Sequence, residues 1–581
     1  MSDTKPPREL ADAVTALRPS IVLAAWFSVF AGLLILAPSA YMLEVYDRVV
    51  SSRSPMTLAM LTLLVLVAYA LMEILDWARS ETLLDASHQL DRHLHSRVFS
   101  AVFQARLQGH SAGNLQPLHD LRTLREFLYS PALMAALEAP VCAILAALMF
   151  AISPVLGWAA VIGALLQVGI GWMNDRKTQP LLAEANRCAI SAQQTLDASL
   201  RNAQVIESMG MQSDVHRRWQ ARQDDCLGRQ ALASDRAGGF QAMTKFLQVA
   251  LGSLLLGLGA WLLLHNELNG GAGMMIVGSI LGGRVLQPLV LIVTQWRSVV
   301  NARGAWKRLD GLLKTLPPPA ESMPLPAPAG RLQVESVSAA APGSRSLIVK
   351  GVNFSLEPGT VLAVLGPSAS GKTTLARLLV GLWPAAQGKV RLDGADVFTW
   401  DKQELGPHLG YLPQEVELLE GTIAENIARF GEIRMAKVRA AAIAVGLDAD
   451  IMALPLGYDT PVGREGNNFS GGQRQRLGLA RALYGEPTLV VLDEPNSSLD
   501  EAGDAALAAA IRELKSRGTT FVVMTHRTSV LGVADRILVL HDGVMQAFGA
   551  RDEVLAALKK ASDEMLARQS ARQSKPLAEA A

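Results

Sequence analysis

The sequence predicts two domains of different class: an all-α membrane domain over residues 1–315 and an α/β domain over residues 331–559. Half of the 581 residues are hydrophobic, which is typical of chains with membrane segments. These residues are concentrated before residue 300, whereas short strands alternate with helices after residue 331, as in a largely parallel sheet. The net charge is +1, so no overall positive field favours nucleic acid, and we expect no nucleic-acid partner.

Apolar runs of about 20 residues recur in the first domain, and a helix of that length crosses a bilayer. They cover Ile21–Leu43, Met56–Leu75, Leu133–Ile152, Val155–Met173, Phe246–Leu264 and Met274–Thr294. The alternative is a set of buried helices, but a soluble core rarely holds this much apolar helix. We therefore predict six transmembrane helices in a lipid bilayer.

The connections between these runs alternate in length. Those after the first, third and fifth runs are predicted to be short loops: residues 44–55, 153–154 and 265–273. Those after the second and fourth runs are long and rich in arginine, and basic loops prefer the cytoplasmic side. We expect the long connections to be helical extensions into the cytoplasm, with turns around Gly113-Asn114 and Gly210.

A proline-rich segment, LPPPAESMPLPAPAG over residues 316–330, separates the two domains. Proline at this density acts as a semi-rigid spacer without internal hydrogen bonds. The polar, alanine-rich tail over residues 560–581 is predicted to be disordered. Cys142, Cys188 and Cys226 show no CxxC spacing, so we expect isolated, reduced thiols.

The strongest chemical motif is GPSASGKT over residues 366–373, which fits the phosphate-loop pattern GxxxxGK[ST]. It follows the apolar strand Val361–Leu365 and precedes a helix-like segment, so backbone N–H groups and a helix N-terminus can bind phosphates. Lys372 is expected to reach the β- and γ-phosphates, and the Thr373 hydroxyl to coordinate Mg²⁺. The predicted nucleotide-binding residues here are Gly366, Pro367, Ser368, Ala369, Ser370, Gly371, Lys372, Thr373 and Thr374. The second domain is therefore predicted to be a P-loop nucleotide-binding domain.

An acidic pair, Asp493-Glu494, ends the apolar run Leu489–Leu492, which resembles a buried parallel strand. In this position Asp493 can hold Mg²⁺ and Glu494 can polarise an attacking water. An acidic pair at a strand end is also a common surface feature, so its significance depends on the phosphate loop.

Residues 469–483 read FSGGQRQRLGLARAL, and this segment resembles the signature of ATP-binding-cassette (ABC) proteins. The matching residues are Ser470, Gly471, Gly472 and Gln473, whose backbone N–H groups lie at a helix start, where anions bind. In the family this site binds the γ-phosphate of ATP held by an opposite subunit. The resemblance therefore implies a homodimer.

Other ABC elements match in chain order. Gln414 resembles the glutamine that senses Mg²⁺ and contacts the membrane domain, Asp500 lies in the segment resembling the D-loop, and His526 resembles the histidine that contacts the γ-phosphate. The resemblance thus implies ATP and Mg²⁺ as ligands, with catalytic roles for Glu494, His526 and Gln414 and metal contacts from Thr373, Gln414 and Asp493.

Two departures from the family pattern stand out. Pro461 replaces the usual glutamate in the segment over residues 460–466. Ala341 stands where the family has an aromatic residue that stacks on adenine, so we expect weaker adenine selectivity and acceptance of GTP.

The membrane half also resembles a family, the type I secretion ATPases, in LEVYDRVVSSRSPMTL (43–58) and NAQVIESMGM (202–211). The protease-exporting branch is the most similar. This resemblance implies a bacterial inner-membrane exporter that works with a periplasmic adaptor and an outer-membrane channel, on a protein cargo with a C-terminal secretion signal. Only about 20 residues precede the first run, so we expect no cysteine-protease domain there.

Other functions remain open from the sequence. A transporter with the same ATPase domain could export a lipid or a small molecule. A non-transporting ATP-gated channel or scaffold is disfavoured, because Glu494 and His526 are both present. Within the spans, Glu138 and Arg284 either line a polar path or act as an interhelical pair or snorkelling side chains, and Gly282-Gly283 permits close helix approach.

Overall fold

The computed structural model describes residues 9–109, 113–268, 271–318, 323–344, 346–463, 466, 468–525 and 527–560. The chain forms two compact units, one over residues 1–106 and 111–318 and the other over residues 107–110 and 319–581. Each unit is described by itself. The tail from residue 561 onwards lies outside the described residues, so its predicted disorder stays a prediction.

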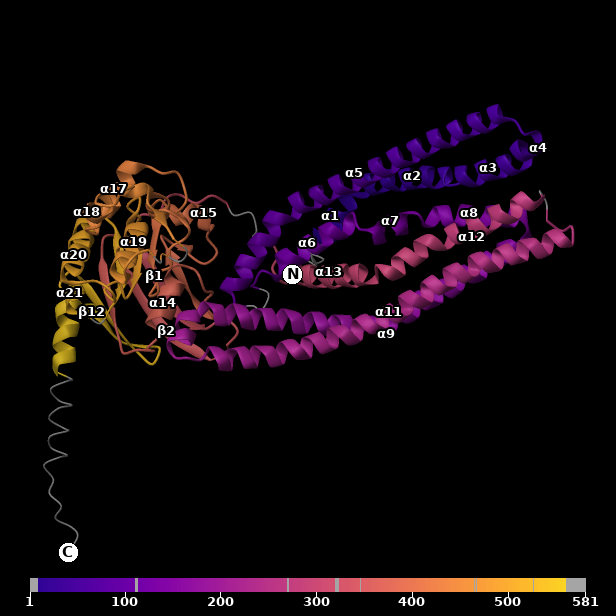
Figure 1. The fold of residues 1–581 in the computed structure, drawn as a ribbon. Coiled ribbons are helices and arrows are strands. Elements are labelled where there is room, and N and C mark those ends of the chain that lie inside the picture. The colour runs from indigo at the N-terminus through magenta and orange to yellow at the C-terminus, as the bar shows by residue number, and fades with distance from the viewer. Residues whose placement is uncertain are drawn as a thin grey trace, which may run out of the picture. The chain divides into compact units, whose positions relative to one another are not determined.

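The first unit consists of helices (Figure 1). They are α1 (Glu9–Ala16), α2 (Arg18–Leu34), α3 (Ala37–Glu44), the π-helical turn η1 (Val45–Val49), α4 (Val50–Ser52), α5 (Pro55–Leu107), α6 (Gln116–Leu128), α7 (Pro131–Leu137), α8 (Ala139–Ile152), α9 (Pro154–Arg201), α10 (Ala203–Ser208), α11 (Gln212–Leu264), α12 (Gly271–Thr294) and α13 (Trp296–Thr315).

The membrane-spanning helices agree with the predicted runs. Five helical stretches of the described chain are long and apolar enough to cross a bilayer, and α7 with α8 forms a sixth span that is bent by 47°. The bend lies at Glu138, just before Pro140 on the first turn of α8. Proline lacks an N–H, and its ring clashes with the carbonyl four residues earlier, which breaks a helix.

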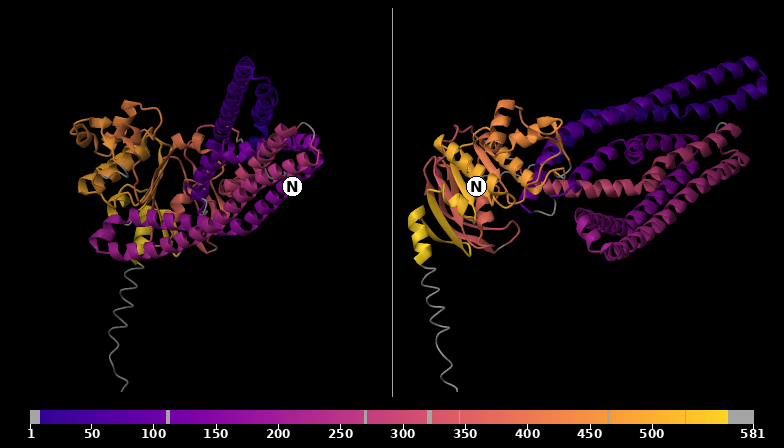
Figure 2. Two further views of the ribbon diagram at one scale, coloured as in Figure 1. Left: turned by 45° about the vertical axis from the view of Figure 1, so that its right-hand side comes forward. Right: turned by 60° about the vertical axis from the view of Figure 1, so that its left-hand side comes forward.

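The long connections are helical, as predicted. Helices α5, α9 and α11 run far beyond their apolar segments, with 53, 48 and 53 residues. The chain reverses near Gly109 and Gly210, whose φ angles of 67° and 65° suit glycine. Helices α9 and α11 run side by side in both views of Figure 2.

Two expectations about the first unit were wrong. Residues 44–55 are not a loop, because the helix continues through η1 to Ser52 and ends only at Arg53, which has a φ of 53°. No glycine or proline interrupts this stretch before Pro55. The thiols of Cys188 and Cys226 are not isolated, because they form a disulfide between α9 and α11, with Cα atoms 5.5 Å apart. The antiparallel helices bring together cysteines 38 residues apart, which a spacing motif does not reveal.

The second unit is an α/β domain. Its strands are β1 (Leu332–Ala340), β2 (Leu347–Leu356), β3 (Val361–Leu365), β4 (Gln387–Leu392), β5 (Ala395–Asp396), β6 (Leu409–Leu412), β7 (Gly421–Thr422), β8 (Pro461–Val462), β9 (Leu489–Asp493), β10 (Thr520–Met524), β11 (Arg536–His541) and β12 (Val544–Ala550). Its helices are α14 (Lys372–Leu379), α15 (Lys402–Leu405), α16 (Ile423–Ile427), α17 (Met435–Ala444), α18 (Asp448–Met452), α19 (Gly471–Leu483), α20 (Glu501–Ser516) and α21 (Thr528–Leu531), with 3₁₀ turns at Gly406–His408 and Gly457–Asp459. Residues 551–560 are also helical.

The main sheet has the strand order β12-β11-β3-β10-β9-β6 and is parallel except for its edge strand β12. Alternate residues of β3 enter two cores. Val361 and Ala363 pack with the core formed by α16, α17, α19 and α20, while Leu362 and Val364 pack with α14 and the antiparallel sheet β2-β1-β4-β5. This two-sided burial explains the continuous apolar strands.

Candidate functional site in the α/β domain

Four neighbouring strands end at one edge of the main sheet. Strands β3, β10, β9 and β6 are adjacent and parallel, and they end within one residue of one another: Met524 lies opposite Asp493 and Val364, and Leu412 lies opposite Leu492. The segments that follow these strands therefore meet at one edge, where ligands of open α/β sheets bind. This edge carries the phosphate loop, the Asp493-Glu494 pair and Gln414.

The phosphate loop turns tightly between β3 and α14. Ala369 and Gly371 have φ angles of 62° and 100°. A Cβ atom at Gly366 would lie 2.3 Å from the carbonyl oxygen of Leu540, so only glycine fits there. The Lys372 side chain is 7% exposed, and its Nζ donates to the carbonyl oxygens of Gly366 and Pro367 at 2.7 and 3.0 Å. These bonds hold the ammonium group inside the loop, where it can exchange carbonyl oxygens for phosphate oxygens.

Asp493 is a buried carboxylate at the end of β9. It is 1% exposed, and neither carboxylate oxygen accepts a hydrogen bond of normal geometry from a described residue. Burial raises the pKa of Asp493, and the nearby Thr373 hydroxyl, Arg377 and Lys372 oppose that rise. A buried carboxylate beside a hydroxyl is a fitting donor set for Mg²⁺, which prefers oxygen ligands and would stabilise the ionised form.

Glu494 has a strained backbone. Its φ angle is 49°, a conformation that costs energy for a non-glycine residue and often occurs at functional sites. Its backbone N–H donates to the carbonyl of Met524 at 3.0 Å, so strand β10 fixes the turn. The side chain is half-buried at the sheet edge. Gln414 is exposed two residues beyond β6, and His526 lies outside the described residues.

The signature residues form the start of α19. The Ser470 hydroxyl accepts from the Gln473 N–H at 3.2 Å, and the Gln473 side chain accepts from the Ser470 N–H at 3.0 Å. This capping box satisfies two N–H groups and leaves other N–H groups of the first turn for an anion. A Cβ atom at Gly472 would lie 3.0 Å from the Ser498 carbonyl oxygen, so the signature packs closely on the segment before Asp500.

Asp500 has a local structural contact. Its carboxylate caps α20 by accepting from the Gly503 N–H at 2.9 Å. Among the described residues, no hydrogen bond or ion pair links Ser470, Gln473 or Asp500 to the phosphate loop. The structure thus gathers one group of candidates at the sheet edge and places the other at the starts of α19 and α20.

Gln475 was not among the predicted site residues. This residue is buried on α19, and its Nε2 donates to the carbonyl of Pro495 at 3.1 Å. It therefore connects the signature helix to the turn that carries Glu494. The only signal in the sequence was a polar residue on the apolar face of a helix.

Comparisons with known proteins agree with this geometry. A family model described as ABC transporter matches residues 349–497, and one described as ABC transporter transmembrane region matches residues 21–282. The chain is 41% identical to the type I secretion system ATP-binding protein PrsD of Rhizobium meliloti, over 91% of each chain. It is 29% identical to the cyclolysin secretion/processing ATP-binding protein CyaB of Bordetella pertussis, over 88% of this chain and 72% of the relative.

A solved structure of a bacterial Atm1-family ABC exporter with ATP bound has the same fold. The TM-score is 0.81 at 22% sequence identity, and the superposition covers 97% of this chain and all of the other.

Proposed function

The chain belongs to the ABC transporter family, and from this premise we propose that it is the ATP-hydrolysing exporter of a type I secretion system. Its family ATPase domain couples ATP hydrolysis to transport. The relatives named for type I secretion and cyclolysin secretion favour a polypeptide cargo over a lipid or small molecule. The cargo that we propose is an unfolded protein with a C-terminal secretion signal.

The phosphate loop binds the nucleotide in this proposal. Backbone N–H groups of residues 366–371 and the N-terminus of α14 cradle the phosphates, and Lys372 leaves the carbonyls of Gly366 and Pro367 for phosphate oxygens. Thr373, Asp493 and Gln414 are the residues that would hold Mg²⁺, which would neutralise charge on the phosphates.

Hydrolysis needs a positioned water. Glu494 lies at the same sheet edge, held in place by its backbone bond to β10, and we assign it the role of orienting and polarising that water. His526 is proposed to contact the γ-phosphate.

A second copy of the chain completes each site. Ser470–Gln473 and Asp500 are not linked to the phosphate loop within one chain, yet the start of α19 offers N–H groups to an anion. In a homodimer, the signature of one copy closes on the nucleotide held by the other, so ATP joins the two domains and hydrolysis releases them.

The location and the other partners follow from the proposed system. The chain is a membrane protein whose described residues include five helices able to span a bilayer, or six with the bent pair α7 and α8. We place it in the bacterial inner membrane with the α/β domain in the cytoplasm. A periplasmic adaptor and an outer-membrane channel would complete the route.

The observation that carries this proposal is a phosphate loop with Asp493 and Glu494 at the same sheet edge, in a chain whose membrane domain is similar to that of a type I secretion protein. The test is the ATPase rate of the protein in nanodiscs with C-terminal peptides of candidate secreted proteins. A saturable change with one peptide supports protein export. A response only to lipids or apolar small molecules would favour the small-substrate exporter.

A further inference from the structure

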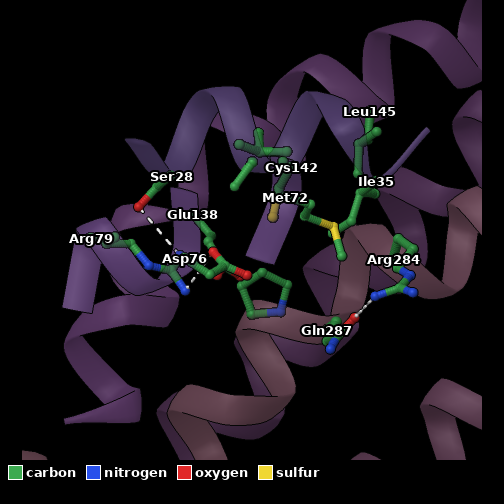
Figure 3. A pocket seen from close by; sticks show the side chains of 14 residues that line it. Ser28, Ile35, Met72, Asp76, Arg79, Glu138, Cys142, Leu145, Arg284 and Gln287 are labelled. Atoms are coloured by element: carbon green, nitrogen blue, oxygen red, sulfur yellow. Dashed lines mark hydrogen bonds and ion pairs between the residues drawn. The ribbon is translucent and has the colours of Figure 1, made fainter. Parts of the chain in front are cut away.

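The membrane unit contains a small polar cavity between α2, α5, α8 and α12 (Figure 3). Its volume is about 50 Å³, which is room for a few waters. The cavity can therefore take one small polar group and not a length of polypeptide. Its polar and charged lining residues are Ser28, Asp76, Arg79, Glu138, Arg284 and Gln287.

One wall of the cavity is an ion-pair network around Arg79. The guanidinium contacts a Glu138 oxygen at 2.8 Å and an Asp76 oxygen at 3.2 Å, and its side chain is only 10% exposed. Glu138 reaches Arg79 because it lies at the bend between α7 and α8. One guanidinium thus contacts two carboxylates, so both acids of this wall have an ionic partner.

The opposite wall carries Arg284, in the middle of the apolar helix α12. Its Nη1 donates to Gln287 on the same helix at 3.0 Å, and within the described chain no carboxylate lies at ion-pair distance from it. Figure 3 shows Arg284 and Gln287 apart from Arg79 and Glu138, with Met72 between. A charged residue within a span is costly and usually faces a cavity or a partner.

We infer that Arg284 binds a carboxylate of the exported polypeptide. Its planar guanidinium has five donors, of which one is used in the structure, and its fork matches a carboxylate. A basic side chain of the cargo is a poorer fit, because Asp76 and Glu138 are already paired with Arg79. The half-buried Arg284 is therefore the group of this cavity that most lacks a partner, and an acidic side chain of the cargo supplies it.

This inference rests on the proposed function and names a feature of the cargo. Because the cavity holds one small group, Arg284 contacts one acidic side chain at a time as the exported polypeptide passes. It predicts that an exporter of this structure prefers acidic over neutral segments of otherwise equal sequence.

Cys142 provides the readout, because it lines the same cavity and is a free thiol, whereas Cys188 and Cys226 are bonded to each other. The experiment measures the rate at which a small neutral maleimide alkylates Cys142 in nanodiscs without reductant. The probes are a short glutamate-containing peptide and its glutamine counterpart. We expect the acidic peptide to slow alkylation saturably, at a concentration at least about tenfold lower than the neutral one requires.

Three variants separate charge from structure. Arg284→Gln should abolish the difference between the two peptides. Arg284→Lys should retain part of it, because a point charge remains without the fork. Arg297→Gln, which removes an exposed arginine on α13, should leave it unchanged. If Arg284→Gln does not yield folded protein, the Arg284→Lys variant and the two peptides still test whether Arg284 causes the difference in Cys142 protection.

Equal protection of Cys142 by the two peptides, no protection by either, or an undiminished difference in Arg284→Gln would overturn the inference. Protection by anionic phospholipid in the nanodisc instead of peptide would assign the site to a lipid and also overturn it. If both peptides stimulate the ATPase equally, only the carboxylate site fails. If no peptide affects the ATPase and a lipid does, the proposed protein export itself fails.

Discussion

At the scale of single residues, Lys372 has the most directly testable role. Its ammonium group is held by two carbonyl oxygens, and phosphates would replace them. Lys372→Ala should weaken ATP binding by about 10- to 100-fold, because a hydrogen bond to a charged group contributes about 1.5–3 kcal/mol. Binding of a fluorescent ATP analogue measures this directly. Lys350→Ala, at an exposed position of β2 in the same domain, is the matched control, and unchanged binding in Lys372→Ala would refute the site.

Glu494 is expected to act on the chemical step and not on binding. Glu494→Gln keeps the side-chain shape but removes the base, so turnover should fall by about 10²- to 10⁴-fold while ATP still binds. The variant should accumulate as an ATP-bound dimer, seen as retained nucleotide after gel filtration. Rapid exchange of nucleotide in this variant would contradict the assignment.

Ala341 stands at the position where an aromatic side chain of the family stacks on the nucleotide base. Residues 337–344 contain no aromatic side chain, so adenine loses a stacking contact that contributes about 1–3 kcal/mol in other base-binding proteins. We expect ATP and GTP to bind with similar affinities in a competition assay. Introducing the aromatic side chain, Ala341→Tyr, should restore a preference for ATP. A strong preference for ATP in the unaltered protein would show that another group holds the base.

The tight turn of the phosphate loop after β3 could be predicted from the sequence, because a turn around phosphates needs glycine and lysine at fixed spacing. The burial of the Asp493 carboxylate and the hydrogen bond from Gln475 to the carbonyl of Pro495 could not be predicted. Both depend on packing between segments far apart in the chain. The capping role of Asp500 was also missed, although a carboxylate before a helix is a common cap.

At the scale of elements, the disulfide between α9 and α11 fixes two long helices to each other. We expect protein prepared without reductant to show one thiol that reacts with iodoacetamide after unfolding, that of Cys142. After reduction, Cys188 and Cys226 should react as well, as mass spectrometry of their peptides would show. Because cytoplasmic thiols are usually kept reduced, the comparison should be repeated on protein alkylated inside cells.

Cys142→Ser serves as the control for this measurement, because it should leave no reactive thiol before reduction. Reaction of all three cysteines in the unreduced protein would contradict the bond. In the oxidised state the helix pair should also resist thermal unfolding more than after reduction, since a cross-link restricts the unfolded chain.

The helices themselves were largely predictable, because apolar runs of membrane length and long polar extensions have clear patterns. The bend at Glu138 has a local cause in Pro140, although the apolar run Leu133–Ile152 was predicted to be one continuous span. The π-helical turn over Val45–Val49 was predicted as loop because polar residues break the apolar run there. Polar residues do not end a helix outside the bilayer when glycine and proline are absent.

At the scale of the whole molecule, the two-domain organisation follows from composition, since the apolar residues, the proline-rich segment and the α/β pattern occupy separate stretches. Transport requires both units, because the phosphate site can bind and hydrolyse ATP but offers no path through a membrane. The membrane unit in turn has a polar cavity but no source of energy. In the proposed homodimer, the second copy supplies the opposite signature, because among the described residues no hydrogen bond or ion pair links Ser470, Gln473 or Asp500 to the phosphate loop of the same chain.

The most direct test of this account is ATP-dependent movement of a protein with a C-terminal secretion signal into proteoliposomes that contain the exporter with its α/β domain outside. We predict that ATP protects the cargo from external protease with wild-type protein, but not with Glu494→Gln, and not when the C-terminal segment of the cargo is removed. Failure of ATP to protect any such cargo, while the same vesicles move a lipid or small apolar molecule, would contradict the account.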